Sequence, residues 1–146
     1  MLPFKVVLRS GESPYRQVVH AATRAVVSGE LPGGAPFPSV RELSQQLKIN
    51  PNTAHKVVAE LVRTGILEVR PGIGTVVATG RRGSPEERRK LLSREVERLV
   101  VEAKRLDLEV EEVMAAVAGR WAELTGLAPA PLVPEGAVPP EREEGS

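Results

Sequence analysis

Residues 51–64 carry polar side chains at helical spacing that are suited to contacting nucleic acid. At about 100° per residue, one arc of this segment is apolar and the opposite arc is polar or small. The polar arc and its flanks comprise Asn52, Thr53, His55, Lys56, Ala59 and Arg63. Asn52 can pair with adenine through two hydrogen bonds, Lys56 can bind guanine or phosphate, and Ala59 leaves room for close approach. The pattern favours a helix in a major groove, with an ordinary solvated helix face as the alternative.

Two helix starts adjoin this segment in the sequence. Residues 39–42 have the S-x-x-E spacing of a capping box, and Asn50 is a cap residue followed by proline. The free N–H groups and the positive dipole end of each helix are able to bind phosphate. Arg41 opposes the dipole of its own helix, which suggests an external anion. An ion pair with Glu42 or another carboxylate is the alternative.

Two β-prone runs, 66–70 and 75–78, follow this helix and predict a hairpin. The hairpin tip is Pro71-Gly72-Ile73-Gly74. The guanidinium of Arg70 is able to enter a narrow minor groove, and Gly72 lets the backbone approach a phosphate. An ordinary turn is the alternative, since glycine is common in turns.

Three helices are needed to position these side chains. Ser13-Pro14 predicts the start of a first helix that ends at Gly29, and the short second helix begins after Ser39. The intervening segment 31–38, rich in proline and glycine, is predicted as a loop with Phe37 as its apolar anchor. Helix, helix, tight turn, helix and hairpin is the element order of a winged helix-turn-helix.

The second half of the sequence predicts two amphipathic helices. The first starts at a capping box, Ser84 to Glu87, and extends to about Leu106, and the second covers roughly 110–124. Two such helices have too little partner surface within one chain, so we expect them to dimerise. The residues expected at the dimer interface are Leu92, Val96, Leu99, Val100, Ala103, Val113, Val117 and Trp121. Packing of both helices onto the same subunit is the alternative.

Composition excludes several kinds of active site. The 146 residues include no cysteine and two histidines, so disulfides, thiolate metal sites and cysteine nucleophiles are excluded. No nucleophile with a base and an orienting acid is evident, and we expect neither enzyme activity nor a cofactor. Glu109, Glu111 and Glu112 are candidate metal ligands, but carboxylates at a helix start are typical of solvated residues favoured by the dipole. We therefore expect no metal.

Charge and hydropathy indicate the partner and the compartment. Residues 1–80 have a net charge of +4 and residues 81–146 a net charge of −3, so we expect the first half to bind an anionic partner. No apolar run approaches the ~18 residues of a membrane span, and no signal-peptide core follows Met1. We expect a soluble, cytoplasmic protein that does not bind membranes.

The span 14–77 resembles the DNA-binding domain of the GntR superfamily. The resemblance rests on the motifs PSVREL (38–43), NPNT (50–53), LVRTGIL (61–67) and GIGTVV (72–77). The short helical second half resembles the YtrA subfamily, whose members lack a large effector domain. The resemblance implies a bacterial transcription regulator, usually a repressor, that binds a palindromic operator as a homodimer.

The resemblance also implies which residues contact DNA. By motif position they are Arg41, Asn52, Thr53, His55, Lys56, Arg70 and Gly72. Two departures from the family pattern are Pro51 and Pro71, which stand where many relatives carry a basic residue. The contact set is therefore thinner here, and the operator sequence does not carry over from relatives.

The sequence thus predicts a mostly α fold with a small β-hairpin, in four parts. They are an extended N-terminal arm (1–12), a winged helix-turn-helix DNA-binding domain (13–80), a helical dimerisation segment (81–127) and a flexible Pro/Glu-rich tail (128–146). The expected partners are double-stranded DNA and a second copy of the chain, and no effector is identified. The alternative function is a protein–protein interaction module without DNA specificity.

Overall fold

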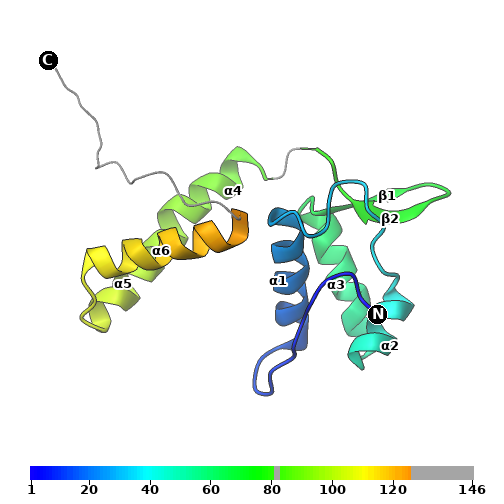
Figure 1. The fold of residues 1–146 in the computed structure, drawn as a ribbon, viewed down its shortest axis with the longest axis horizontal. Helices are drawn as coiled ribbons and strands as arrows, with labels where there is room; N and C mark the ends of the chain where they lie inside the picture. The colour runs from blue at the N-terminus through cyan, green and yellow to red at the C-terminus, as the bar shows by residue number, and fades with distance from the viewer. Residues whose placement is uncertain (81–82, 126–146) are drawn as a thin grey trace, which may run out of the picture. The chain divides into compact units, whose positions relative to one another are not determined.

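The computed structural model describes residues 1–80 and 83–125, which form two units (Figure 1). The first unit is Met1–Arg94 and the second begins at Glu95; each is described here by itself. The elements are α1 (Pro14–Val27), α2 (Val40–Leu47), α3 (Pro51–Arg63), β1 (Leu67–Arg70), β2 (Gly74–Val77), α4 (Pro85–Lys90), the π-helix η1 (Leu91–Glu95), α5 (Val96–Arg105) and α6 (Val110–Thr125). The Pro/Glu-rich segment 128–146 lies outside the described residues.

The helices α1, α2 and α3 begin at the caps that the sequence predicts. Ser13 caps α1, and Ser39 and Glu42 form a reciprocal capping box on α2. The Ser39 hydroxyl accepts from the Glu42 N–H at 3.1 Å, and the Glu42 carboxylate accepts from the Ser39 N–H at 2.9 Å. Asn50 caps α3 by accepting from the Asn52 N–H at 2.7 Å. Each cap satisfies a backbone donor that the first helical turn leaves free.

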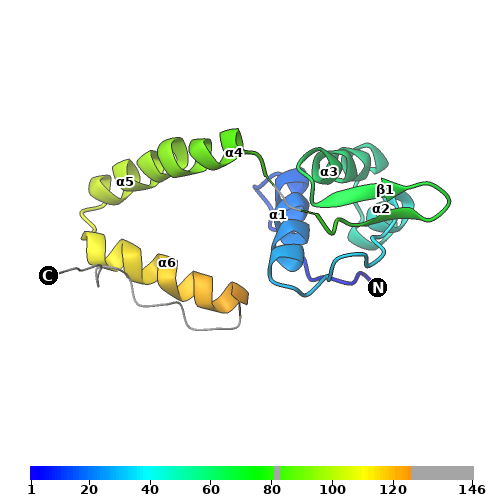
Figure 2. The same ribbon diagram turned by 90° about the horizontal axis from the view of Figure 1, so that it is seen from above.

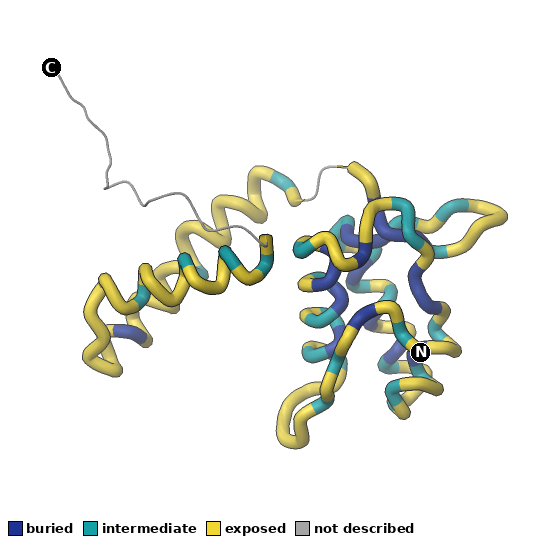
Figure 3. Tube along the Cα trace, in the orientation of Figure 1, coloured by how far each residue is buried: buried dark blue, intermediate teal, exposed yellow. Residues whose placement is uncertain are grey.

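The core of the first unit lies between these helices and the hairpin. α3 packs against α1, α2 and β1, and each of these three helices contains buried residues (Figure 3). The largest fully buried side chains are Val18, Leu43, Val57, Leu61, Leu67 and Val77. Burial of each such side chain contributes about 1.5–3 kcal/mol by area. This aliphatic core makes α3 a rigid support for its exposed arc.

The turn between α2 and α3 is very tight, as predicted. Lys48 has a left-handed backbone with φ of 55°, and the Ile49 N–H donates to the Ser44 carbonyl at 3.1 Å. This geometry ends α2 and lets α3 begin three residues after Lys48, at Pro51. The two helices and their short connection form the helix-turn-helix.

The hairpin β1–β2 is antiparallel and pairs Leu67 with Val77 and Arg70 with Gly74. Its strands differ by one residue at their ends from the predicted runs 66–70 and 75–78. The Ile73 N–H donates to the Arg70 carbonyl at 3.0 Å and closes the tip. The fold is therefore a winged helix-turn-helix whose wing is this hairpin (Figure 2).

The segment 31–38 is more ordered than the loop that the sequence predicts. Pro36 forms an isolated antiparallel bridge with Val76, and the Phe37 N–H donates to the Thr75 carbonyl at 3.0 Å. Ala35 accepts from the Val77 N–H at 2.8 Å. Prolines are compatible with a sheet edge because an edge residue does not need to donate on both sides. The segment is a loop, as predicted, because no helix or strand lies between Val27 and Val40, and its bridge to β2 is the feature that the sequence did not reveal.

The N-terminal arm is fastened to α1 and to the core. Gln17 of α1 accepts from the Arg9 N–H at 2.7 Å and donates to the Arg9 and Glu12 carbonyls at 3.0 and 3.1 Å. Phe4 is buried, and its ring stacks on Phe37 with centroids 5.6 Å apart. Phe37 is thus the apolar anchor that the sequence predicts, and Phe4 is its partner.

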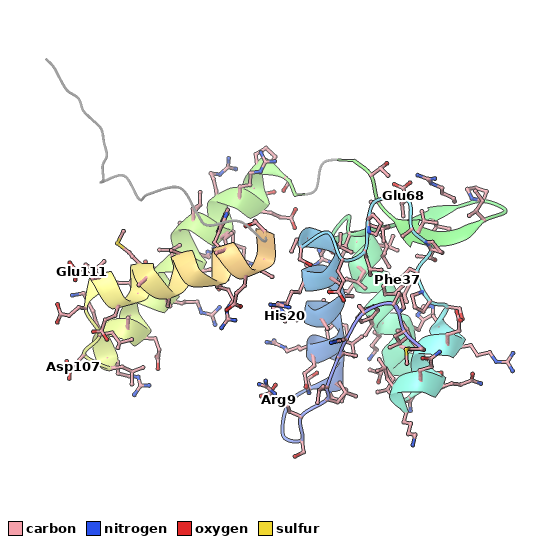
Figure 4. The ribbon with its side chains drawn as sticks, in the orientation of Figure 1. Arg9, His20, Phe37, Glu68, Asp107 and Glu111 are labelled. Atoms are coloured by element: carbon pink, nitrogen blue, oxygen red, sulfur yellow. The ribbon has the colours of Figure 1, made fainter. Side chains whose placement is uncertain are left out.

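The second half is helical as predicted, with one difference. Ser84 and Glu87 form a capping box on α4, but Leu91–Glu95 is π-helical, so the predicted long helix is not α-helical throughout. A π-turn holds more residues than an α-turn, and periodicity at 3.6 does not reveal it. Asp107, with φ of 59°, and Glu111 lie near the connection that leads into α6 (Figure 4).

Candidate nucleic-acid interface

α3 presents the predicted polar arc to solvent. Asn52, His55, Lys56 and Arg63 are exposed, whereas Ala54, Val57 and Leu61 on the opposite arc are fully buried. Ala59 is exposed between the polar side chains, and Thr53 is half-buried. The core fixes the rotation of the helix, so this arc is the one that an outside partner meets.

A groove runs beside this arc. It has a volume of about 480 Å³ and is lined by Tyr15, Thr53, Lys56, Ala59, Glu60 and Arg63. Three of the predicted contact residues, Thr53, Lys56 and Arg63, are therefore brought together on one concave surface. The groove also holds an acidic side chain, Glu60, that the sequence analysis did not single out.

Arg63 is paired with Glu60 on the same helix. Its Nε donates to Glu60 Oε1 at 2.8 Å and its Nη2 donates to Oε2 at 2.6 Å. The pairing with Arg63 and a hydrogen bond from the Tyr15 hydroxyl hold the pKa of Glu60 below its usual value, and the same pair raises the pKa of Arg63. The spacing of three residues was the signal in the sequence that could have revealed this pair.

Arg41 is exposed in the first turn of α2, which packs against α3. The alternative of a pair with Glu42 is not what the structure contains, because that carboxylate accepts from Ser39. Within residues 1–80 and 83–125, Arg41 and Lys56 have no carboxylate at ion-pair distance. Both cations are available to an external anion.

The wing carries Arg70 at the end of β1, next to the turn, and Gly72 at its tip. Arg70 Nε donates to Glu68 Oε2 at 2.8 Å, and Glu68 lies on β1 (Figure 4). Gly72 is exposed with φ of 79°, a conformation that glycine adopts readily. Ile73 beside it is 71% exposed and was not predicted as a contact residue. The tip is small and protruding, as entry into a minor groove requires.

The residues predicted for dimerisation are largely uncovered. Leu92 is 72% exposed and Trp121 is 63% exposed. Val96, Leu99, Val100 and Val117 are exposed as well, Val113 is half-buried, and Ala103 is buried. Salt-bridged pairs such as Arg98–Glu95 and Arg120–Glu123 occupy other positions of η1, α5 and α6.

Other chemistry has little support in the described residues. No three His, Asp or Glu side chains gather as metal ligands in the ranges 1–80 and 83–125. Glu112, one of the candidate ligands, accepts from the Glu109 N–H at 3.1 Å at the start of α6. None of the described helices is both long and apolar enough for a membrane span.

Comparison with known proteins gives a consistent result. Residues 14–77 match the gntR family of bacterial regulatory proteins. The chain is 35% identical to the HTH-type transcriptional regulator YhcF of Bacillus subtilis, over 75% of this chain and 90% of YhcF. It is 29% identical to the HTH-type transcriptional repressor YtrA of that organism, over 72% of this chain and 82% of YtrA. The structure of a transcriptional antiterminator from Listeria monocytogenes EGD-e matches with a TM-score of 0.75 at 25% identity, over 87% of this chain and 96% of that one.

Proposed function

The chain belongs to the gntR family of bacterial regulatory proteins, and from this premise we propose that it represses transcription by binding a pseudo-palindromic operator as a homodimer. In this proposal residues 13–80 bind double-stranded DNA, residues 81–127 dimerise, and the arm 1–12 braces the first helix. The protein acts by occupying DNA, without enzyme activity and without a cofactor.

The observation that carries the proposal is the exposed polar arc of α3. Asn52 and Lys56 lie on the face opposite the fully buried Leu61, so the helix can enter a major groove without disturbing the core. Arg41 at the N-terminus of α2 is placed for a phosphate, and Gly72 at the wing tip for the adjacent minor groove. Base contacts then supply specificity and phosphate contacts supply register.

The exposed apolar side chains of α5 and α6 support dimerisation. Large apolar patches on a soluble protein mark interaction sites, and side chains such as Leu99 and Trp121 gain about 1.5–3 kcal/mol each on full burial. A two-fold pair presents two α3 helices about 34 Å apart, which matches an inverted repeat. Repression is proposed because YtrA, to which the chain is similar, is named a repressor.

The test is selection of bound fragments from random duplex DNA with the full chain. We expect an enriched inverted repeat whose half-site centres are about 10 base pairs, or a multiple of one helical turn, apart. A Lys56→Ala variant should bind the selected site more weakly while its oligomeric state, measured by sedimentation, stays unchanged. Enrichment of no sequence, or loss of the dimer in the variant, would contradict the proposal.

A further inference from the structure

We propose that Glu60 and Glu68 determine specificity: each holds the Nε edge of an arginine on the DNA-binding surface and cancels its charge, which weakens binding to unrelated DNA. The inference rests on the DNA-binding function proposed above. It deepens that function by separating two kinds of cation on one surface, those with a carboxylate partner and those without one.

The first pair is Glu60 with Arg63. Two of the five guanidinium N–H groups point at the Glu60 carboxylate, at 2.8 and 2.6 Å, so three remain for another acceptor. The Arg63 side chain is 67% exposed while that of Glu60 is 25% exposed, so the acid lies beneath and the arginine outside. Tyr15 of α1 lines the same groove as this pair.

The second pair is Glu68 with Arg70, on the wing. These residues are two apart on β1, so their side chains leave the same face of the strand. The bond again uses Nε, at 2.8 Å, and both terminal nitrogens of Arg70 remain for an outside acceptor. The same arrangement thus occurs on α3 and on the wing, the two elements proposed to enter DNA grooves.

Arg41 and Lys56 on the same surface differ, since neither has a carboxylate at ion-pair distance in the ranges 1–80 and 83–125. A free cation attracts any phosphate, whatever the sequence. A neutralised arginine has little attraction at a distance, but its outward N–H groups still bond an acceptor in the right place, such as a guanine edge. The carboxylates therefore lower the affinity that does not depend on sequence, and they leave the directional hydrogen bonds of the two arginines available.

The experiment compares Glu60→Gln, Glu68→Gln and the double variant with the wild type as full chains. Glu102→Gln is the matched control, because Glu102 pairs with Arg105 at the same spacing on α5 and its loss changes net charge equally. Each protein is titrated with random duplex and with the selected site at 50–200 mM salt. Thermal unfolding is followed in parallel, so a folding defect is seen separately.

We expect Glu60→Gln and Glu68→Gln each to bind random duplex more tightly than the wild type at low salt. The logarithmic salt slope should steepen by about 0.9 for each arginine freed, so that the gain fades about threefold between 50 and 200 mM. The gain on the selected site should be smaller, so the preference for it falls. Glu102→Gln should follow the wild type.

Two results would overturn the inference: a salt slope on random duplex equal to that of the wild type, or an equal change for random and selected DNA. Failure of the proposed function looks different. A wild type with no preferred sequence contradicts that function, while the salt slopes of the glutamine variants on random duplex still decide the role of the two glutamates. A wild type that binds no duplex overturns both.

Discussion

Glu60 accepts two hydrogen bonds from Arg63 on α3. Its carboxylate is stabilised in the ionised form, because the Arg63 cation donates to it. The pair therefore links the charge of the polar arc of α3 to pH.

This linkage predicts a pH effect on stability. Because the pKa of Glu60 in the folded chain lies below its ordinary value of 4.5, the pair stabilises the fold above that value. The contribution is lost as the pH falls through the lowered pKa. Between pH 5 and pH 3 the wild type should lose slightly more stability than Glu60→Gln, because solvent screens this pair at its arginine end. Denaturant unfolding at several pH values measures the free energy of unfolding of both proteins. Equal dependence of this free energy on pH in the two proteins would contradict the prediction.

At the scale of elements, two capping boxes of the same type have different surroundings. Ser39 begins α2, which buries Leu43 completely, whereas Ser84 begins α4, which has no buried residue. A helix that packs into a core transmits the loss of its cap to the whole domain. A helix without a core contact frays locally.

Ser39→Ala should therefore lower the free energy of unfolding of the winged domain by about 1 kcal/mol, or roughly 4–8 °C in the midpoint. Ser84→Ala is the control and should leave that midpoint unchanged. Calorimetry of both variants provides the measurement. Equal shifts of the midpoint in Ser39→Ala and Ser84→Ala would show that the cap itself, and not the packing around the helix, determines the loss of stability.

For the whole molecule, the first unit has a core of its own and the second leaves most of its apolar side chains exposed. Stability of the first should not depend on protein concentration, whereas order in the second should, if a second copy covers it. DNA affinity then depends on both units, since a dimer links two winged domains and so raises the effective concentration of each recognition helix at its half-site.

Leu99→Glu should convert the proposed dimer to a monomer, because a carboxylate would be buried without a partner. Affinity for the inverted repeat should fall by at least about 100-fold, while the winged domain still unfolds at the same temperature. Val7→Glu, at an exposed apolar residue of the N-terminal arm, is the control and should stay dimeric. Sedimentation velocity would reveal a variant that remains a dimer, which would refute this interface.

Local signals predicted most of the fold. The caps at Ser39 and Asn50 and the apolar arcs act within one helix, so sequence spacing suffices to find them. The pairing of residues 34–37 with β2 is non-local and leaves no periodic pattern, and the π-helix has no period of its own. At the candidate site the exposed arc was predictable. The three-residue spacing of Glu60 and Arg63 allows their pair, but side-chain rotamers decide whether this pair and the pair of Arg70 form.

The stacking of Phe4 on Phe37 connects the N-terminal arm to the wing. Phe37 is hydrogen-bonded to Thr75 in β2, so one ring contact and one backbone hydrogen bond join the arm to this strand. Removal of residues 1–12, or a tag fused beside them, would therefore disturb a packing contact of the segment that is bonded to β2. If removal of the arm weakens DNA binding, the first explanation to test is a displaced wing, and a change in α3 is the second.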